Sequence, residues 1–292
     1  MLLALVSGCD LTKMTADMTT GVFQRAAPAF EQYWDYDLAG DAAPAQIIQL
    51  EGVLRIVPDN KKLLPQLIRA YDGYAMGWVE TAADKAEIRG DYEESAKQNL
   101  RAKLFYERAR DLAMHQIRLD HEGIDDALKM GVDDFSAWLK KNFKKKGDAE
   151  VLLWAGYSWG SYIKMSKDDM TAVADLAYVK ALVQRSIDLD PDYYHSAGTL
   201  FLAVATTQEM SADMDQAKKL FEEALAKTQR RNLLVQLNMA RYYAVKRDDK
   251  ALFEKLLHEV LDAGDVLPDA RLGNQIAKAK AAVYLEMESR LF

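Results

Sequence analysis

Five residues near the middle of the chain, 156–160, have the G-x-S-x-G spacing of the nucleophile elbow in serine hydrolases. In that chemistry Ser158 would attack an acyl carbonyl, and only His195 or His258 lies downstream to accept its proton. The elbow needs a serine held on a turn between a strand and a helix, whereas the flanking residues have the apolar spacing of a helix. We therefore expect a helical Ser158, no enzymatic activity, and little loss of stability when Ser158 is replaced by alanine.

The other titratable residues lack the spacing of a metal site or of a catalytic carboxylate pair. No two histidines stand three or four residues apart, as two metal ligands on one helix would. Acidic pairs at 125–126, 133–134 and 168–169 fall in loops or at predicted helix starts, where carboxylates accept backbone N–H groups. We expect no metal and no cofactor. The histidines are His115, His121, His195 and His258.

The charge balance argues against nucleic acid as a partner. The chain carries 38 Lys and Arg against 45 Asp and Glu, and its net charge of −7 would repel phosphates over most of the surface. One basic run, 140–146, stands out in this acidic chain. We interpret it as the solvated end of a helix, where cations favour the helix dipole. Contact with anionic lipid or with an acidic partner is the alternative.

The only cysteine, Cys9, follows an apolar run and two small residues, and this pattern resembles the lipobox that ends a bacterial lipoprotein signal peptide. The run is too short to span a bilayer, and it lacks the basic start of a whole signal peptide. We expect residues 1–9 to be the remnant of such a peptide, with Cys9 acylated and held on a membrane. Asp10 resembles the signal that keeps some lipoproteins at the inner membrane. An apolar N-terminus with a buried cysteine is the alternative.

Composition and periodicity predict an all-α fold. Half of the residues are apolar, whereas only 15 Gly and 6 Pro are available for turns, too few for a protein of many short strands. From residue 45 onward, apolar residues recur at helical spacing between short polar breaks. We expect a polar tether over residues 10–20 and a single α-helical repeat domain over 21–292, whose first helix lies around 22–36.

Two predicted helices carry the small–large–small pattern of a tetratricopeptide unit, in which small side chains let two helices approach closely. Ala251 follows Ala217 by one 34-residue period, although the rest of that unit is not kept. These patterns predict an irregular, tetratricopeptide-like solenoid of helical pairs with a concave side. A non-repetitive helical bundle is the alternative. The two trios are Ala102, Tyr106 and Ala109, and Ala217, Phe221 and Ala224.

Aromatic side chains are the best candidates for binding a ligand or a partner. A stripe within residues 71–78 shares one helical face, a pattern typical of a core. The helix predicted over 151–163 carries aromatics on two faces roughly 100° apart, and only one face can pack on its partner helix. We expect Trp159 in the core, with Trp154 and Tyr157 lining a cleft. The candidates for the cleft or partner surface are Tyr71, Tyr74, Trp78, Trp154, Tyr157, Tyr193 and Tyr194.

Three segments together carry a family resemblance. Residues 149–160 contain Trp-x-Gly-x-x-Trp-Gly, residues 185–193 end in Leu-Asp-Pro-Asp-Tyr, and residues 67–80 contain Ala-Tyr-x-x-Tyr-Ala-x-x-Trp. The first two patterns are distinctive, whereas the remainder is tetratricopeptide-like. From about residue 46 to the C-terminus, the chain resembles the T component associated with tripartite ATP-independent periplasmic (TRAP) transporters.

The resemblance implies a periplasmic, lipid-anchored, tetratricopeptide-type protein that forms a homotrimer and docks the substrate-binding subunit of the transporter. It also implies a hydrophobic cleft or pore in each protomer that receives the ligand. A lipoprotein scaffold of the same fold for another envelope complex is the second reading. A serine esterase built on Ser158 is a distant third.

Overall fold

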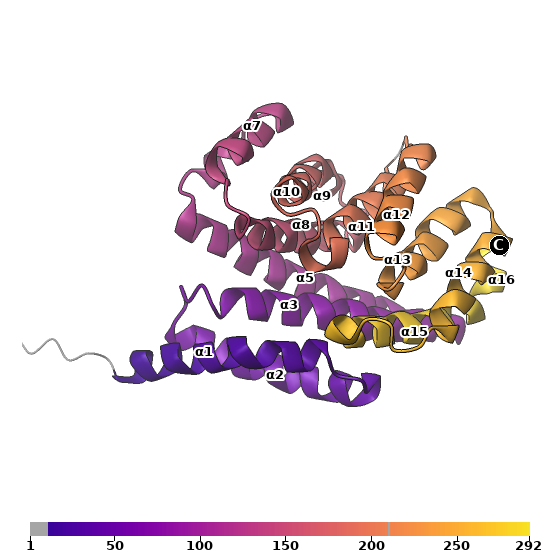
Figure 1. Ribbon diagram of the computed structural model, residues 1–292, viewed down its shortest axis with the longest axis horizontal. Coiled ribbons are helices and arrows are strands. Elements are labelled where there is room, and N and C mark those ends of the chain that lie inside the picture. Colours follow the sequence, from indigo (N-terminus) through magenta and orange to yellow (C-terminus); the bar gives the residue numbers. More distant parts are fainter. Residues whose placement is uncertain (1–10, 210) are drawn as a thin grey trace, which may run out of the picture.

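The computed structural model describes residues 11–209 and 211–292, and every regular element within these ranges is a helix (Figure 1). The all-α prediction is confirmed. The first half of the chain forms α1 (Leu11–Glu31), α2 (Tyr36–Ile56), α3 (Leu64–Tyr74), η1 (Ala75–Val79), α4 (Glu80–Ile88), α5 (Tyr92–Asp120), α6 (Ile124–Ala127) and α7 (Val132–Asn142). The second half forms α8 (Asp148–Lys164), α9 (Met170–Ala174), α10 (Leu176–Leu189), α11 (Tyr193–Gln208), α12 (Met214–Lys227), α13 (Leu233–Asn238), η2 (Met239–Ala244), η3 (Val245–Arg247), α14 (Lys250–Asp262), η4 (Pro268–Ala270), α15 (Arg271–Glu286) and α16 (Glu288–Leu291).

The segment expected as a polar tether is the first half of α1, which begins at Leu11. Ala16 and Thr20 lie on one side of this helix and are buried. The Asn60 side-chain amide, in the turn between α2 and α3, donates hydrogen bonds to Asp17 at 2.6 Å and to Thr20 at 3.2 Å. The polar residues of this stretch therefore hold a helix against the domain, because their partners come from a distant part of the sequence.

The polar breaks between predicted helices contain the residues that start them. Asp35, Asp91, Asp213 and Asp249 each precede a helix and accept a backbone N–H from its first turn at 2.9–3.1 Å. Asp169 caps α9 in the same way. Each carboxylate satisfies a donor that the helix itself leaves without a partner. Of the three acidic pairs placed in loops or at helix starts, Asp169 is confirmed as a cap, and the pairs at 125–126 and 133–134 lie in the first turns of α6 and α7.

Both small–large–small trios are buried in contacts between helices. Ala102, Tyr106 and Ala109 of α5 are fully buried, and α5 packs against α3, α4 and α8. The second trio, on α12, is fully buried as well, and α12 packs against α11. The small residues permit the close approach that the pattern predicts, and the aromatic ring fills the space between the helices.

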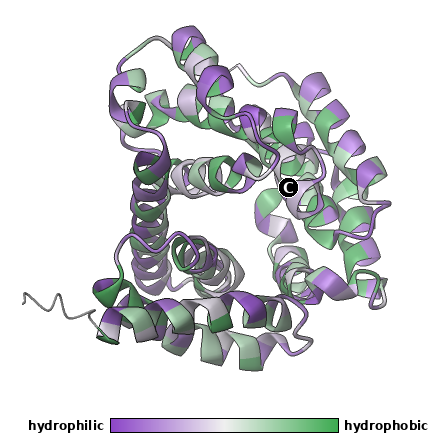
Figure 2. Ribbon diagram, turned by 60° about the vertical axis from the view of Figure 1, so that its left-hand side comes forward, coloured by the Kyte–Doolittle hydropathy of each residue, from purple (hydrophilic) through white to green (hydrophobic). Residues whose placement is uncertain are grey.

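Near the C-terminus, α15 returns to the N-terminal helices, so that the chain forms a ring (Figure 2). Leu272 and Ile276 of α15 pack against Ala39 of α2. The Lys280 ammonium of α15 is buried and donates to the carbonyl of Met76 in η1 at 3.3 Å. These contacts join residues more than 200 positions apart, and they bring η1 between α2, α5 and α15.

Candidate functional site

The aromatic residues singled out in the sequence fall into two groups in the structure. Trp154, Tyr157, Tyr193 and Tyr194 meet between α8 and α11, and this set with Phe201 is called the inner cluster below. The others lie on α3 and η1, facing α2 and α5. Residues far apart in sequence thus come together, but the seven candidates do not form one site.

The inner cluster is held by ring contacts and one hydrogen bond. The Trp154 ring makes edge-on contacts with Tyr157, at 5.6 Å between ring centroids, and with Tyr194, at 4.9 Å. Its indole N–H donates to the Tyr193 hydroxyl at 3.3 Å. Phe201 of α11 completes the cluster beside Tyr157, at 6.2 Å. Edge-on pairs of this kind stabilise beyond the apolar area that they bury.

A left-handed turn places Tyr194 on Trp154. Tyr194, His195 and Ser196 have φ values of 48°, 55° and 60°, a region in which the side chain of an L-residue crowds the next carbonyl. The Asn232 side-chain amide donates to the carbonyl of His195 at 3.2 Å and helps to hold the turn. Nothing in the local sequence signals this conformation, since none of the three residues is glycine. Such strain persists only where surrounding contacts determine it.

The exposure of the two tryptophans on α8 is the reverse of the expectation. Trp154 is buried, with 7% of its surface exposed, whereas Trp159 is half-buried beside Ile163 and Val179. The 3.6-residue period separates the two faces correctly but does not say which face meets α11. The strained turn at the start of α11 covers Trp154, and that is a tertiary feature.

Ser158 lies in the interior of α8, and its side chain bonds to a buried acid instead of a base. Its Oγ is 2.7 Å from Oδ2 of Asp72 on α3 and 2.8 Å from the carbonyl of Trp154. Burial raises the pKa of Asp72 well above its usual range. The Ser158 hydroxyl donates to Asp72, and this bond offsets part of the effect of burial on the pKa of Asp72.

A second buried polar group joins α4, α5 and α8. The Lys164 ammonium lies 2.7 and 2.8 Å from the two carboxylate oxygens of Glu80, and the Tyr106 hydroxyl donates to the same carboxylate. Burial alone raises the pKa of Glu80, but the ammoniums of Lys164 and Lys280 outweigh it and leave this pKa below its usual value. Glu80 is therefore an anion paired within the protein, and no spacing in the sequence indicates this pairing.

An open groove lies between α2 and α5, with η1 as its floor. Trp78 stacks on Tyr36, at 5.1 Å between centroids, and on Tyr74, at 6.0 Å. The Arg101 guanidinium of α5 lies 5.5 Å from the Tyr74 ring and 5.3 Å from the Phe105 ring. The groove has a volume of about 270 Å³. Its lining residues are Asp37, Gly40, Asp41, Tyr74, Trp78, Val79, Ala82, Gln98 and Arg101.

Both helices beside this groove carry apolar side chains in solvent. Leu38 and Ile48 of α2 are exposed, and so are Leu100 and Leu104 of α5. A bidentate ion pair between Arg108 and Glu51, with two N–O distances of 2.8 Å, joins α5 to α2 beyond the groove. Tyr71 lies at that closed end, where it is buried and donates to Glu51 at 2.8 Å. Tyr74 and Trp78 therefore line the groove and are accessible to a partner, whereas Tyr71 is buried and does not line it.

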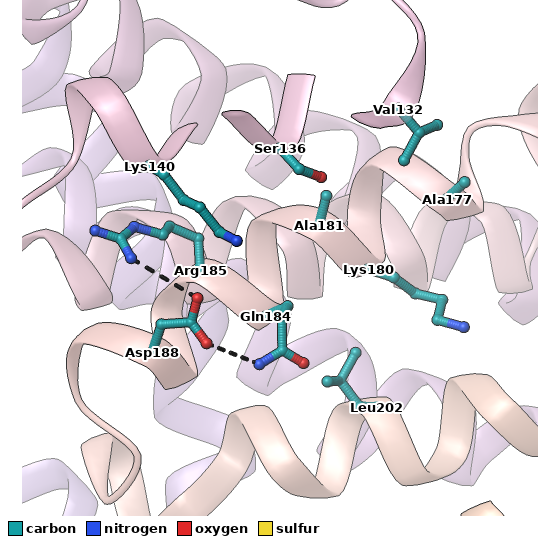
Figure 3. A pocket seen from close by; sticks show the side chains of 10 residues that line it. All are labelled: Val132, Ser136, Lys140, Ala177, Lys180, Ala181, Gln184, Arg185, Asp188 and Leu202. Carbon is teal, nitrogen blue, oxygen red and sulfur yellow. Dashed lines mark hydrogen bonds and ion pairs between the residues drawn. The ribbon is translucent and has the colours of Figure 1, made fainter. Parts of the chain in front are cut away.

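Another groove, of about 420 Å³, lies between α7, α10 and α11 (Figure 3). Val132, Ala181 and Leu202 give it apolar surface, and Lys140 extends across it from α7. The Arg185 guanidinium at its end donates to the carbonyl of Phe143. Lys140 belongs to the basic run at the end of α7, so the interpretation of this run as a helix end fits the structure.

Several predicted features fall outside these sites. Cys9 and Asp10 lie outside the described residues. Among the described residues, no group of histidine, cysteine and acidic side chains has the arrangement of a metal site. No helix in the same ranges combines the length and the apolar character that crossing a bilayer requires.

The comparison with known protein families gives one match. The sequence matches the family described as TRAP transporter T-component over residues 32–292, which include the groove between α2 and α5 and the inner cluster. No curated protein matches the chain significantly. The match covers nearly all of the sequence and agrees with the motifs around Trp78, Trp154 and Tyr193. The chain therefore belongs to the TRAP transporter T-component family.

Proposed function

We propose that this T-component is a non-enzymatic adaptor that docks the substrate-binding subunit of a TRAP transporter in the groove between α2 and α5. The observation that carries the proposal is the open groove floored by Tyr74 and Trp78, with Arg101 fixed over the tyrosine ring. Tryptophan, tyrosine and arginine are the residues on which binding energy is most often concentrated in protein interfaces. The exposed leucines and isoleucine beside the groove supply the surrounding apolar surface.

The groove is ordered before a partner arrives. Trp78 lies between two aromatic rings, and its indole N–H donates to the carbonyl of Tyr36 at 3.2 Å. Arg101 donates to the Tyr74 hydroxyl at 3.2 Å as well as lying over its ring. Side chains held in this way lose little conformational freedom on binding, which favours affinity. Asp37 and Asp41 on the α2 side would meet a basic side chain of the partner, and Arg101 would meet an acidic one.

A ligand-receiving role for the inner cluster is a second part of the proposal. Five aromatic rings meet there, and Trp154 is covered by a strained turn, Tyr194 to Ser196. Release of that turn would expose an apolar, aromatic surface that suits a hydrophobic ligand. The strain lowers the free energy that such an opening requires.

The remaining parts of the proposal concern assembly and location. We propose a periplasmic protein anchored through acylated Cys9, with Asp10 favouring the inner membrane, and an assembly of three protomers. The pairing of α5 with α8 and of α11 with α12 supports a tetratricopeptide-type solenoid. A lipoprotein scaffold for another envelope complex is the alternative, and it would use the same groove for a different partner.

Binding measurements on single variants test the docking role. A TRAP substrate-binding subunit from the same organism should bind in calorimetry, and Trp78→Ala should weaken binding by about tenfold or more. Arg101→Gln should also weaken it and should not impair folding, because Arg101 is exposed. Trp34→Ala removes an exposed tryptophan outside the groove lining and should leave the affinity unchanged. Equal affinity of all four proteins would remove the groove as the docking site.

A further inference from the structure

Helix α1 carries a row of large apolar side chains that no part of the described protein covers. Leu11, Met14, Met18 and Val22 have 68%, 51%, 68% and 65% of their surfaces exposed. Their spacing of three, four and four residues places them on one face, along three turns of the helix. Scattered apolar residues on a surface are ordinary, but a continuous row marks an interaction surface.

The opposite face of α1 is fixed on the domain, so the row has a defined direction. Ala16 and Thr20 are buried there, and Phe23 packs against the main hydrophobic core. The hydrogen bonds from Asn60 to Asp17 and Thr20 hold the same side. Figure 1 shows α1 beside α2 at one edge of the molecule. The apolar row therefore faces away from the protein.

The threonines beside this row are suited to a surface that moves from water into an apolar medium. The Thr15 hydroxyl donates to the carbonyl of Leu11 at 2.8 Å, and the Thr19 hydroxyl donates to that of Thr15 at 2.9 Å. Both hydroxyl protons are thus used within the helix. Polar groups satisfied in this way cost little when they enter an apolar medium.

The charges of α1 indicate what kind of surface it fits. Lys13 and Arg25 balance Asp17 and Glu31, so the helix is neutral in a chain of net charge −7. A neutral helix has no need of anionic headgroups and suits a zwitterionic phospholipid surface. Arg25 is exposed near the far end of the row, and its long side chain could reach a headgroup while its stem covers apolar surface.

A second copy of the chain is a less suitable binding partner for this row than a bilayer. Four side chains on three helical turns supply much less than the roughly 800 Å² per partner of a stable interface. The row spans less than two heptads, whereas a coiled-coil seam is indicated by a heptad pattern kept over at least three. A bilayer surface requires no matching shape and accepts a short row.

The position of α1 in the chain points the same way. Its first residue, Leu11, is two residues from Cys9, so the helix starts within about 7 Å of the proposed acylation site. The family match begins at residue 32, directly after α1 ends at Glu31. The apolar row is therefore a feature of this chain outside the matched region.

We propose that α1 lies flat in the surface of a zwitterionic phospholipid bilayer, with Leu11, Met14, Met18 and Val22 inserted among the acyl chains. An acyl anchor alone leaves a domain free to rotate, whereas a helix along the surface fixes its orientation. The face of α1 that carries Ala16 and Thr20 then points away from the membrane, with α2 and the rest of the ring above it.

The experiment uses the full chain with Cys9→Ser, so that acylation plays no part. This protein should co-sediment with phosphatidylcholine vesicles, and adding Met14→Glu and Met18→Glu should lower the bound fraction by about tenfold. Ile48→Glu is the matched control, since Ile48 is 71% exposed on α2, and vesicle binding should not change. Absence of vesicle binding by the parent, or equal loss in the control, would overturn the proposal.

Two further measurements separate the possible occupants. A solvent-sensitive fluorophore on Met18→Cys should shift to the blue with vesicles, whereas the same label on Gln24→Cys should not. Sedimentation velocity without lipid checks for a second copy, and an association abolished by Met18→Glu would contradict the membrane assignment. The docking proposal is tested independently of this one, because Ile48→Glu should weaken binding of the substrate-binding subunit and Met18→Glu should not.

Discussion

Ser158 on α8 and Asp72 on α3, 86 positions apart in the sequence, share a buried hydrogen bond of 2.7 Å. The serine has one proton and two acceptors within reach, Asp72 and the carbonyl of Trp154. Burial raises the pKa of Asp72 well above its usual range, and the hydrogen bond from Ser158 lowers it in part. The residue that looked most like a catalytic nucleophile instead holds two helices together.

Replacement of Asp72 by asparagine should make the protein more stable at neutral and alkaline pH. The pKa of Asp72 is higher in the folded state than in the unfolded chain, so the folded state holds one more proton between the two values. The free energy of unfolding then decreases as pH rises through that window. The asparagine of Asp72→Asn cannot ionise, so the free energy of unfolding of this variant should decrease less as pH rises. Urea unfolding of both proteins between pH 4 and about 9 measures the free energy of unfolding at each pH. The same dependence on pH in both proteins would contradict the prediction.

Ser158→Ala should destabilise the protein by about 1–3 kcal/mol, because it leaves a buried carboxyl group without its partner. The sequence alone suggested a negligible effect, and the contact with Asp72 changes that expectation. The double variant with Asp72→Leu should recover part of the loss, since both polar groups are then absent. Thermal unfolding measures the stability, and ester hydrolysis by the parent protein that disappears in Ser158→Ala would restore the hydrolase interpretation.

Truncation of the two tryptophans on α8 should have unequal effects. Trp154→Ala removes a buried ring with two edge-on partners and should cost about 3–5 kcal/mol. Trp159→Ala removes a half-buried ring and should cost less. The midpoints of chemical denaturation give both values. A larger loss for Trp159→Ala would show that the face assignment first made from the sequence is correct.

Two glycines on α2 offer a matched pair for testing the groove. A Cβ atom on Gly40 would lie 2.2 Å from Nε1 of Trp78, so Gly40→Ala should displace the indole and weaken docking. The added methyl group should also cost about 1–3 kcal/mol of stability. Gly52 has open space at the same position, and Gly52→Ala should stabilise α2 by about 0.5–1 kcal/mol with docking unchanged. Calorimetry and thermal unfolding read out both variants, and identical behaviour of the pair would refute this account of Trp78.

The sequence by itself determined the local features of this protein. Apolar spacing predicted helices, the acid before α9 was recognised as a cap, and the trio at Ala102 predicted a close helix contact. These features depend on residues a few positions apart, whose geometry is fixed by the helix itself. The family resemblance also rests on short motifs, and the match over residues 32–292 confirms it.

Only the tertiary structure decided which faces of the helices meet. The pairing of Asp72 with Ser158, the covering of Trp154 by a left-handed turn, and the return of α15 to α2 each join distant segments. A helical period gives the angle between two faces but not the neighbour of either one. Those neighbours depend on how distant helices pack against one another, which the spacing of residues within one helix does not contain.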